Sequence, residues 1–153
     1  MARSELDNKL AVLLAGRAAE SICFSEVSTG AADDLKKATD IARSIVTRFG
    51  MDETLGHVAY EEESSPFLSP LAGIPPSAPR YSEDTTHKID EAIRTIIHQA
   101  FDRASAILKE RRATLEAAAK SLLEHETLDE GALAPFARAM REGPTVQEKP
   151  LAA

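Results

Sequence analysis

The stretch ADDLKKATDIARSIVTRF (residues 32–49) decides the fold class of this chain. Its apolar residues recur at intervals of three and four, which is the spacing of one face of an α-helix. This stripe consists of Leu35, Ala38, Ile41, Ala42, Ile45, Val46 and Phe49. Gly50 follows and can take the left-handed conformation that ends a helix, while Ser28 or Thr29 is placed to cap its start. The stretch therefore predicts an amphipathic helix with one face in a core.

Helical periodicity also precedes this stretch. A first helix is predicted from Ser4, which forms a capping box with Asp7. This helix is apolar on nearly all sides, as is typical of a buried helix. Its residues Arg17 and Glu20 are three apart and can reach each other. One interpretation is that Arg17 and Glu20 form a buried or half-buried ion pair. The other is that Glu20 belongs to the wall of a functional site.

Two or three helices are predicted after the stretch. The longest begins at Ser82 and runs to a break near Arg111-Arg112. An apolar stripe then resumes with Leu115, Ala118, Ala119, Leu122 and Leu123. Thr127 and Glu130 form a capping box for a last helix that ends at about Met140. We therefore expect an all-α bundle of four to five helices.

Residues 51–81 interrupt the helices. They hold five of the eight prolines, a density that excludes a regular helix. We interpret them as a mostly irregular loop, either a plain connector or an extended proline-rich ligand segment, with one short strand at residues 57–60. The predicted organisation is one domain over residues 1–142 and a disordered tail over residues 143–153.

Composition excludes several classes of function. The net charge is −7, which argues against a nucleic-acid binder because such proteins need a basic face. The longest apolar run, residues 10–16, is much shorter than the roughly 20 residues that cross a bilayer. No basic region followed by an apolar one opens the chain, so we expect no secretory signal. The single Cys23 fits a reducing compartment. We expect a cytoplasmic location, without a membrane segment in this chain.

Asp34 is the unusual residue of the second helix. On a helical wheel it falls within the apolar stripe, whereas its neighbour Asp33 falls on the polar side. A carboxylate on a buried face is costly unless something pairs with it. Asp34 could interact with its own helix N-terminus, or it could meet a basic side chain or a metal ion. No G-x-x-x-x-G-K-[ST] loop and no H-E-x-x-H motif occurs in the 153 residues, so these patterns alone give no reaction.

Several segments carry a resemblance to a known family. They are LLAGRAAE (13–20), STGAADDL (28–35), LGHVAY (55–60), YSEDT (81–85) and ETLD (126–129). In this order and with compatible spacing they are similar to segments of the FtsH-type ATP-dependent zinc metalloproteases, over about residues 3 to 140. The resemblance implies the C-terminal part of a peptidase domain. In that family this domain follows a membrane anchor and an AAA ATPase module, and hexamers at the cytoplasmic face of the membrane degrade unfolded or short-lived proteins.

The resemblance also assigns residues. Family members hold zinc with the two His of H-E-x-x-H and with the Asp of an "ND" pair, which corresponds to Asp34. Glu20 matches an acid near the metal, and we place it with Arg17 in the shell around the ligands. The H-E-x-x-H helix would precede residue 1. We therefore expect that this chain alone is catalytically incomplete and binds no zinc tightly, because one carboxylate is too few for a tetrahedral site.

Three functions follow from these observations. The first is the C-terminal portion of a zinc metallopeptidase domain, with protein substrates and a hexameric homo-oligomer as partners. The second is a non-enzymatic helical module for assembly or substrate binding, derived from that family. The third is an unrelated hydrolase that uses Asp34, Glu20 and His57, although His57 stands where the family has proline.

Overall fold

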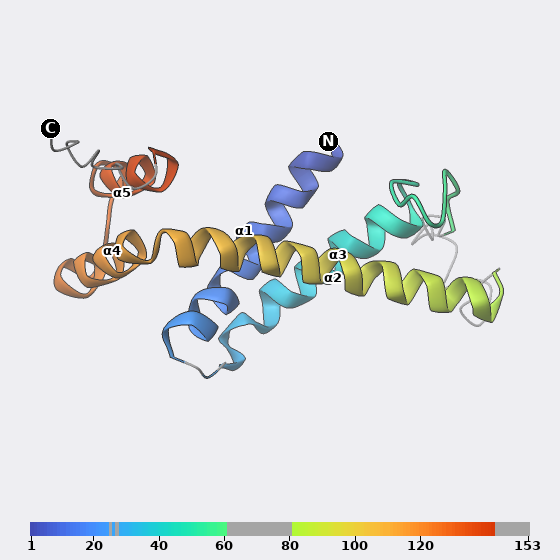
Figure 1. The fold of residues 1–153 in the computed structure, drawn as a ribbon, viewed down its shortest axis with the longest axis horizontal. Coiled ribbons are helices and arrows are strands. Elements are labelled where there is room, and N and C mark those ends of the chain that lie inside the picture. Colours follow the sequence, from blue (N-terminus) through green and yellow to red (C-terminus); the bar gives the residue numbers. More distant parts are fainter. Residues whose placement is uncertain (25, 27, 61–80, 143–153) are drawn as a thin grey trace, which may run out of the picture. The chain divides into compact units, whose positions relative to one another are not determined.

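The structure is a computed structural model that describes residues 1–24, 26, 28–60 and 81–142. Within these residues the chain forms α1 (Arg3–Cys23), the 3-10 helix η1 (Thr29–Ala31), α2 (Ala32–Thr47), α3 (Glu83–Glu110), α4 (Arg112–His125) and α5 (Glu130–Glu142) (Figure 1). The prediction of an all-α protein of four to five helices is confirmed. The chain divides into two compact units, Met1–Ser105 and Ala106–Ala153, and the boundary falls within α3.

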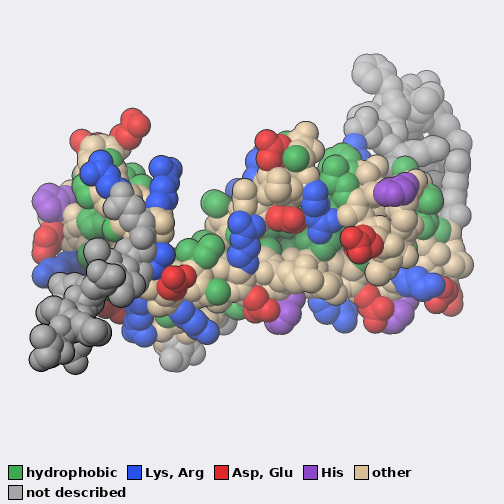
Figure 2. Space-filling model, turned by 45° about the horizontal axis from the view of Figure 1, so that its top comes forward, with side chains coloured by type: hydrophobic (Ala, Val, Ile, Leu, Met, Phe, Trp, Pro, Cys, Tyr) green, Lys and Arg blue, Asp and Glu red, His purple; other side chains and the backbone are tan. Residues whose placement is uncertain are grey.

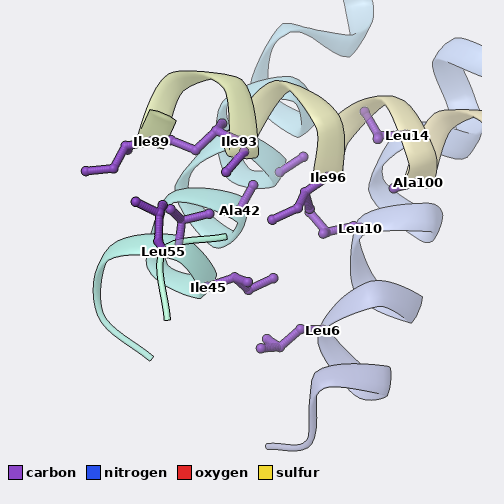
Figure 3. Packing of buried hydrophobic residues seen from close by; sticks show 13 residues of the cluster. Leu6, Leu10, Leu14, Ala42, Ile45, Leu55, Ile89, Ile93, Ile96 and Ala100 are labelled. Atoms are coloured by element: carbon purple, nitrogen blue, oxygen red, sulfur yellow. The ribbon is translucent and has the colours of Figure 1, made fainter. Parts of the chain in front are cut away.

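The first unit has an apolar core between α1, α2 and α3 (Figure 3). Each helix contributes one face, as the periodicity of its sequence predicts. The buried members are Leu6, Leu10, Leu14, Ala38, Ala42, Ile45, Val46, Leu55, Ile89, Ala92, Ile93, Ile96 and Ala100. This core holds α2 against the other two helices from Ala38 onward, and Leu35, next to Asp34, is partly buried against it.

Several helix boundaries follow the predicted signals. Ser28 lies one short helix earlier than predicted: it caps η1, since its hydroxyl accepts a hydrogen bond from the Gly30 N–H at 3.1 Å, whereas α2 has Ala31 as its N-cap and no side-chain cap. The Ser82 hydroxyl accepts one from the Thr85 N–H at 3.2 Å, directly before α3. Gly50 has a φ of +57°, the left-handed conformation expected of it after α2. The predicted break is also confirmed, because α3 and α4 are separated at Arg111.

Two predicted caps are wrong. The first helix begins one residue before Ser4, and its N-cap is Ala2, whose N–H donates to the Glu5 carboxylate at 2.7 Å. Asp7 pairs with Arg3 at 3.0 Å instead of capping. The last helix is capped by a different residue than Thr127: the Asp129 carboxylate accepts from the Ala132 N–H at 2.8 Å. At α5 a second acceptor close to Thr127 is the true cap, whereas α1 begins without a capping side chain at its N-cap.

The loop after α2 is held by Tyr60. Its N–H donates to the Thr47 carbonyl at 2.7 Å, and its hydroxyl donates to the Leu55 carbonyl at 3.2 Å. Its ring meets that of Tyr81 edge to face, with centroids 5.7 Å apart. The anticipated strand at residues 57–60 is not formed, and the pairing found nearby is an isolated bridge between Asp52 and Gly56. Residues 61–80 and the predicted tail at 143–153 lie outside the described residues.

The second unit has a thinner interior. The Arg111 guanidinium donates through Nε to the Met140 carbonyl at 3.3 Å and so links the start of α4 to α5. No residue of α4 is buried, so its predicted apolar stripe does not enter a core. Leu123 is 84% exposed. None of the described helices is both long enough and apolar enough to span a membrane.

Candidate functional site

Asp34 lies in the first turn of α2. Its side chain is 48% exposed, and Lys37 Nζ lies 3.7 Å from Asp34 Oδ1. Asp33 beside it is exposed, so the wheel ranked the two acids in the right order but overestimated how deeply Asp34 is buried. Among the alternatives for Asp34, the structure shows a basic side chain as its neighbour, and this side chain comes from the same helix. Exposed pairs of this kind are weak, so Lys37 can leave Asp34 at little cost.

A hollow of about 590 Å³ lies between α1 and α2, one turn along α2 from Asp34. Lys37, the neighbour of Asp34, is one of its lining residues, and Val12, Leu13 and Ile41 give it an apolar floor. Val12 is 75% exposed, although it lies in the middle of α1. Apolar side chains of this kind reach the surface in several places (Figure 2). The hollow therefore offers an apolar seat on the side of α2 that carries Lys37.

Arg17 and Glu20 are brought together by a third residue, Ser28. The Ser28 hydroxyl donates to Glu20 Oε1 at 2.6 Å, and the Ser28 N–H donates to Glu20 Oε2 at 3.1 Å. Arg17 Nη1 donates to the Ser28 carbonyl at 3.0 Å. These bonds hold the pKa of the Glu20 carboxyl below its ordinary value, mainly through the Ser28 hydroxyl and N–H and to a lesser extent through the Arg17 charge.

This network is one that the sequence only half revealed. Arg17 and Glu20 were expected to reach each other, and Ser28 was expected as a cap, but no pattern connected the two predictions. A polar residue eight positions after an acid carries no signal by itself, because the turn between them decides whether they meet. The network lies at the end of α1 and the start of η1, next to the first turn of α2 (Figure 1).

His57 lies elsewhere. Its Nδ1 is 3.3 Å from the Gly50 carbonyl, beyond the C-terminal end of α2. Asp34 is at the opposite end of that helix, which separates the two residues by about 20 Å at ~1.5 Å per residue. The structure therefore does not bring His57 together with Asp34 as a hydrolase site would require.

The residues present do not fit a zinc site by themselves. Within the described part of the chain, no group of three or more His, Cys, Asp or Glu side chains lies close enough to hold a metal ion. A catalytic zinc site needs about three protein ligands, and near the start of α2 this chain offers the Asp34 carboxylate. Any zinc bound here would require donors from outside the described residues.

Comparison with known proteins identifies relatives along most of the chain. The chain is 52% identical over 128 residues to an "ATP-dependent zinc metalloprotease FtsH" of Paraburkholderia phymatum, and the alignment covers 84% of this chain and 20% of the relative. It is 46% identical over 139 residues to a protein of the same name from Methylibium petroleiphilum, covering 91% of the chain and 22% of the relative. It is 43% identical over 126 residues to a protein of the same name from Thermus thermophilus, and the alignment covers 82% of this chain and 19% of the relative. The chain thus spans about a fifth of the length of these relatives.

The family-level match is equally broad. The model of peptidase family M41 matches residues 1–135, which include α1, η1, α2, α3 and α4. Asp34, Glu20, Arg17 and Ser28 all lie inside the matched range. Since the match extends over most of the sequence and agrees with the relatives found independently, the chain belongs to peptidase family M41.

Proposed function

We propose that this chain is the aspartate-bearing portion of a zinc metallopeptidase domain and that Asp34 is one of the zinc ligands of that domain. The observation that carries the proposal is the position of Asp34: it is the half-buried acid of the pair at the start of α2, in a chain of family M41. The reaction class is metal-assisted hydrolysis of a peptide bond. The donors found in the described residues are too few for it, so we assign no catalytic step to this chain alone.

The hollow between α1 and α2 supports this proposal. Its apolar floor is the kind of surface that an amphipathic helix covers, and Lys37 connects it to Asp34. We propose that a helix bearing H-E-x-x-H occupies this seat, with its two His directed to Asp34. Lys37 would then move away from the carboxylate, because its ammonium and a zinc ion cannot share the same oxygen atoms.

The test is a zinc titration of the full chain with and without a synthetic helical peptide that carries H-E-x-x-H. We expect weak zinc binding by the chain alone and tighter, stoichiometric binding with the peptide. Asp34→Asn should abolish this gain, whereas the matched variant Asp33→Asn should retain it, because Asp33 is exposed in the same turn. Tight zinc binding by the chain alone, or a gain that survives Asp34→Asn, would contradict the assignment.

We propose the remaining properties from the family. As part of the whole enzyme the chain would act on protein substrates within a hexamer at the cytoplasmic face of the membrane, with ATP-dependent unfolding by another module. The names of the relatives support the ATP-dependent proteolysis: they are ATP-dependent zinc metalloproteases about five times the matched length.

A second candidate is a helical module for assembly. The contiguous apolar surface of Val12, Leu13 and Ile41 favours it, since patches of this kind often lie in protein contacts. Light scattering of the chain, alone and mixed with a full-length relative, tests this function. Association with the full-length relative would support an assembly function. A chain that stays monomeric and does not associate with the relative would count against this function.

A further inference from the structure

Ser28 uses every polar group that it has. Its N–H and its hydroxyl both donate to Glu20, its carbonyl accepts from Arg17, and its hydroxyl also accepts from the Gly30 N–H. The partners come from two directions, since Arg17 and Glu20 are on the last turns of α1 and Gly30 is in η1. Because Ser28 is bonded to both helices, it fixes the orientation of η1 relative to the end of α1. We refer to Arg17, Glu20 and Ser28 as the α1–η1 latch.

The latch is directly connected to Asp34. η1 ends at Ala31 and α2 begins at Ala32, with no loop residue between them. Any rotation at Ser28 is therefore passed through one 3-10 turn into the first turn of α2. Ala38, one turn after Asp34, is the first buried residue of α2, and Leu35 beside Asp34 is partly buried against the core. The latch therefore adds a second attachment to the turn that carries Asp34.

We propose that Ser28 is a positioning residue, which sets the orientation of the Asp34 carboxylate by tying the start of α2 to Arg17 and Glu20 on α1. The relevance of this positioning to zinc binding rests on the proposed function, whereas the hydrogen bonds of the latch do not depend on it. It changes the role expected of Glu20 and Arg17: they act through Ser28 rather than by approaching a metal ion. Groups that orient metal ligands through hydrogen bonds are common, and their loss typically weakens metal binding about 10–100-fold.

The proposal is tested with Ser28→Ala in the full chain. The substitution removes the hydroxyl that bonds Glu20 and Gly30 and keeps the backbone groups. Residual dipolar couplings of the amides from Ala32 to Leu35 report the orientation of the first turn of α2 relative to the core. We expect them to change while those of α2 beyond Ala38 do not, and we expect exchange of the Gly30 amide to be about tenfold faster.

Two further variants make the test specific. Ser28→Thr keeps the hydroxyl, and the extended backbone at Ser28 (φ −94°, ψ 172°) accepts a β-branched residue, so it should restore the wild-type couplings. Ser44→Ala is the matched control, because it also removes a serine hydroxyl from a short local bond, to the Asp40 carbonyl at 2.9 Å. Unchanged couplings in Ser28→Ala, or equal changes in Ser44→Ala, would overturn the proposal.

The zinc titration with the H-E-x-x-H peptide separates this inference from the proposed function. If Asp34→Asn has no effect on zinc, the proposed function fails, and the dipolar couplings still decide whether the latch orients the helix. If Asp34→Asn abolishes the gain in affinity but Ser28→Ala leaves it unchanged, Asp34 is a ligand and the positioning role of Ser28 is wrong. We expect Ser28→Ala to reduce the gain about tenfold, with rescue by Ser28→Thr.

Discussion

Leu10 is the side chain whose loss should damage the first unit most clearly. It is fully buried, on the face of α1 that meets Ala42 of α2 and Ile96 of α3 (Figure 3). Leu10→Ala deletes three carbon atoms, and at about 0.8 kcal/mol for each buried carbon the lost transfer free energy is about 2.4 kcal/mol. The cavity adds to this because rigid neighbouring helices collapse only in part. We expect the free energy of unfolding to fall by about 3–4 kcal/mol in total.

Urea unfolding followed by far-UV circular dichroism measures this loss. With a slope of about 1.5 kcal/mol per molar urea, the midpoint should fall by about 2 M. Val12→Ala is the matched control, since Val12 is on the same helix but is 75% exposed, and it should change stability by less than about 0.5 kcal/mol. A loss below about 1 kcal/mol for Leu10→Ala, or equal losses for the two variants, would refute the packing of α1 against α2 and α3.

Three further predictions follow from the structure. Gly50→Ala should destabilise the protein by about 1–2 kcal/mol, because Gly50 has a φ of +57° and an added Cβ would lie 3.2 Å from the His57 Cα. Gly16→Ala should stabilise it by about 0.5–1 kcal/mol, because Gly16 is within α1 and an added Cβ would meet no atom within 4 Å. Thermal unfolding of both variants measures the two opposite effects. The Glu20 carboxyl should titrate below its ordinary range in a carbon-13 NMR experiment, and Ser28→Ala should raise this pKa. Because the folded-state pKa is lowered, the stabilisation by Glu20 should be complete above the pKa of the unfolded chain and should disappear as the pH falls through the folded value. A Glu20 pKa that Ser28→Ala leaves unchanged would show that another group lowers it.

Much of the fold could be predicted because three helices pack along periodic apolar faces. Leu35, Ala38, Ile41, Ala42, Ile45 and Val46 recur with the helical period, and four of these six are buried while Leu35 and Ile41 pack against the cluster. Phe49, the last member of the predicted stripe, lies beyond the end of α2 and is 49% exposed, so its predicted place in the core is wrong. Periodicity works here because each face has a partner. It failed for α4, whose leucines show the same spacing while no α4 residue is buried. A sequence pattern thus specifies which face of a helix is apolar, but it contains no information on whether another element covers that face.

Helix ends were less predictable, for a related reason. Ser4, Asp7, Thr127 and Asp129 all have side chains that can accept a hydrogen bond from a helix N-terminus, and each pair lies within a few residues. The choice between neighbouring acceptors depends on less than about 1 kcal/mol. It can therefore be decided by a competing side-chain pair, such as that of Asp7 with Arg3 one turn apart on the same helix. Ser82 was identified correctly as the start of the longest helix, whereas Ser28 caps η1 and not the second helix, for which it was predicted.

The candidate site shows how far an angular prediction reaches. The wheel gave the direction of Asp34 correctly, since direction depends only on the helical period. Depth depends on the neighbours, and at the first turn of α2 Lys37 is the partner of Asp34 and about half of the Asp34 side chain stays exposed. A carboxylate that points along an apolar face and remains 48% exposed is costly to bury without a partner and is available to one that binds there. This combination is expected of a metal ligand whose site is completed by donors from another segment. Asp34→Asn and Asp33→Asn are therefore the decisive pair of variants.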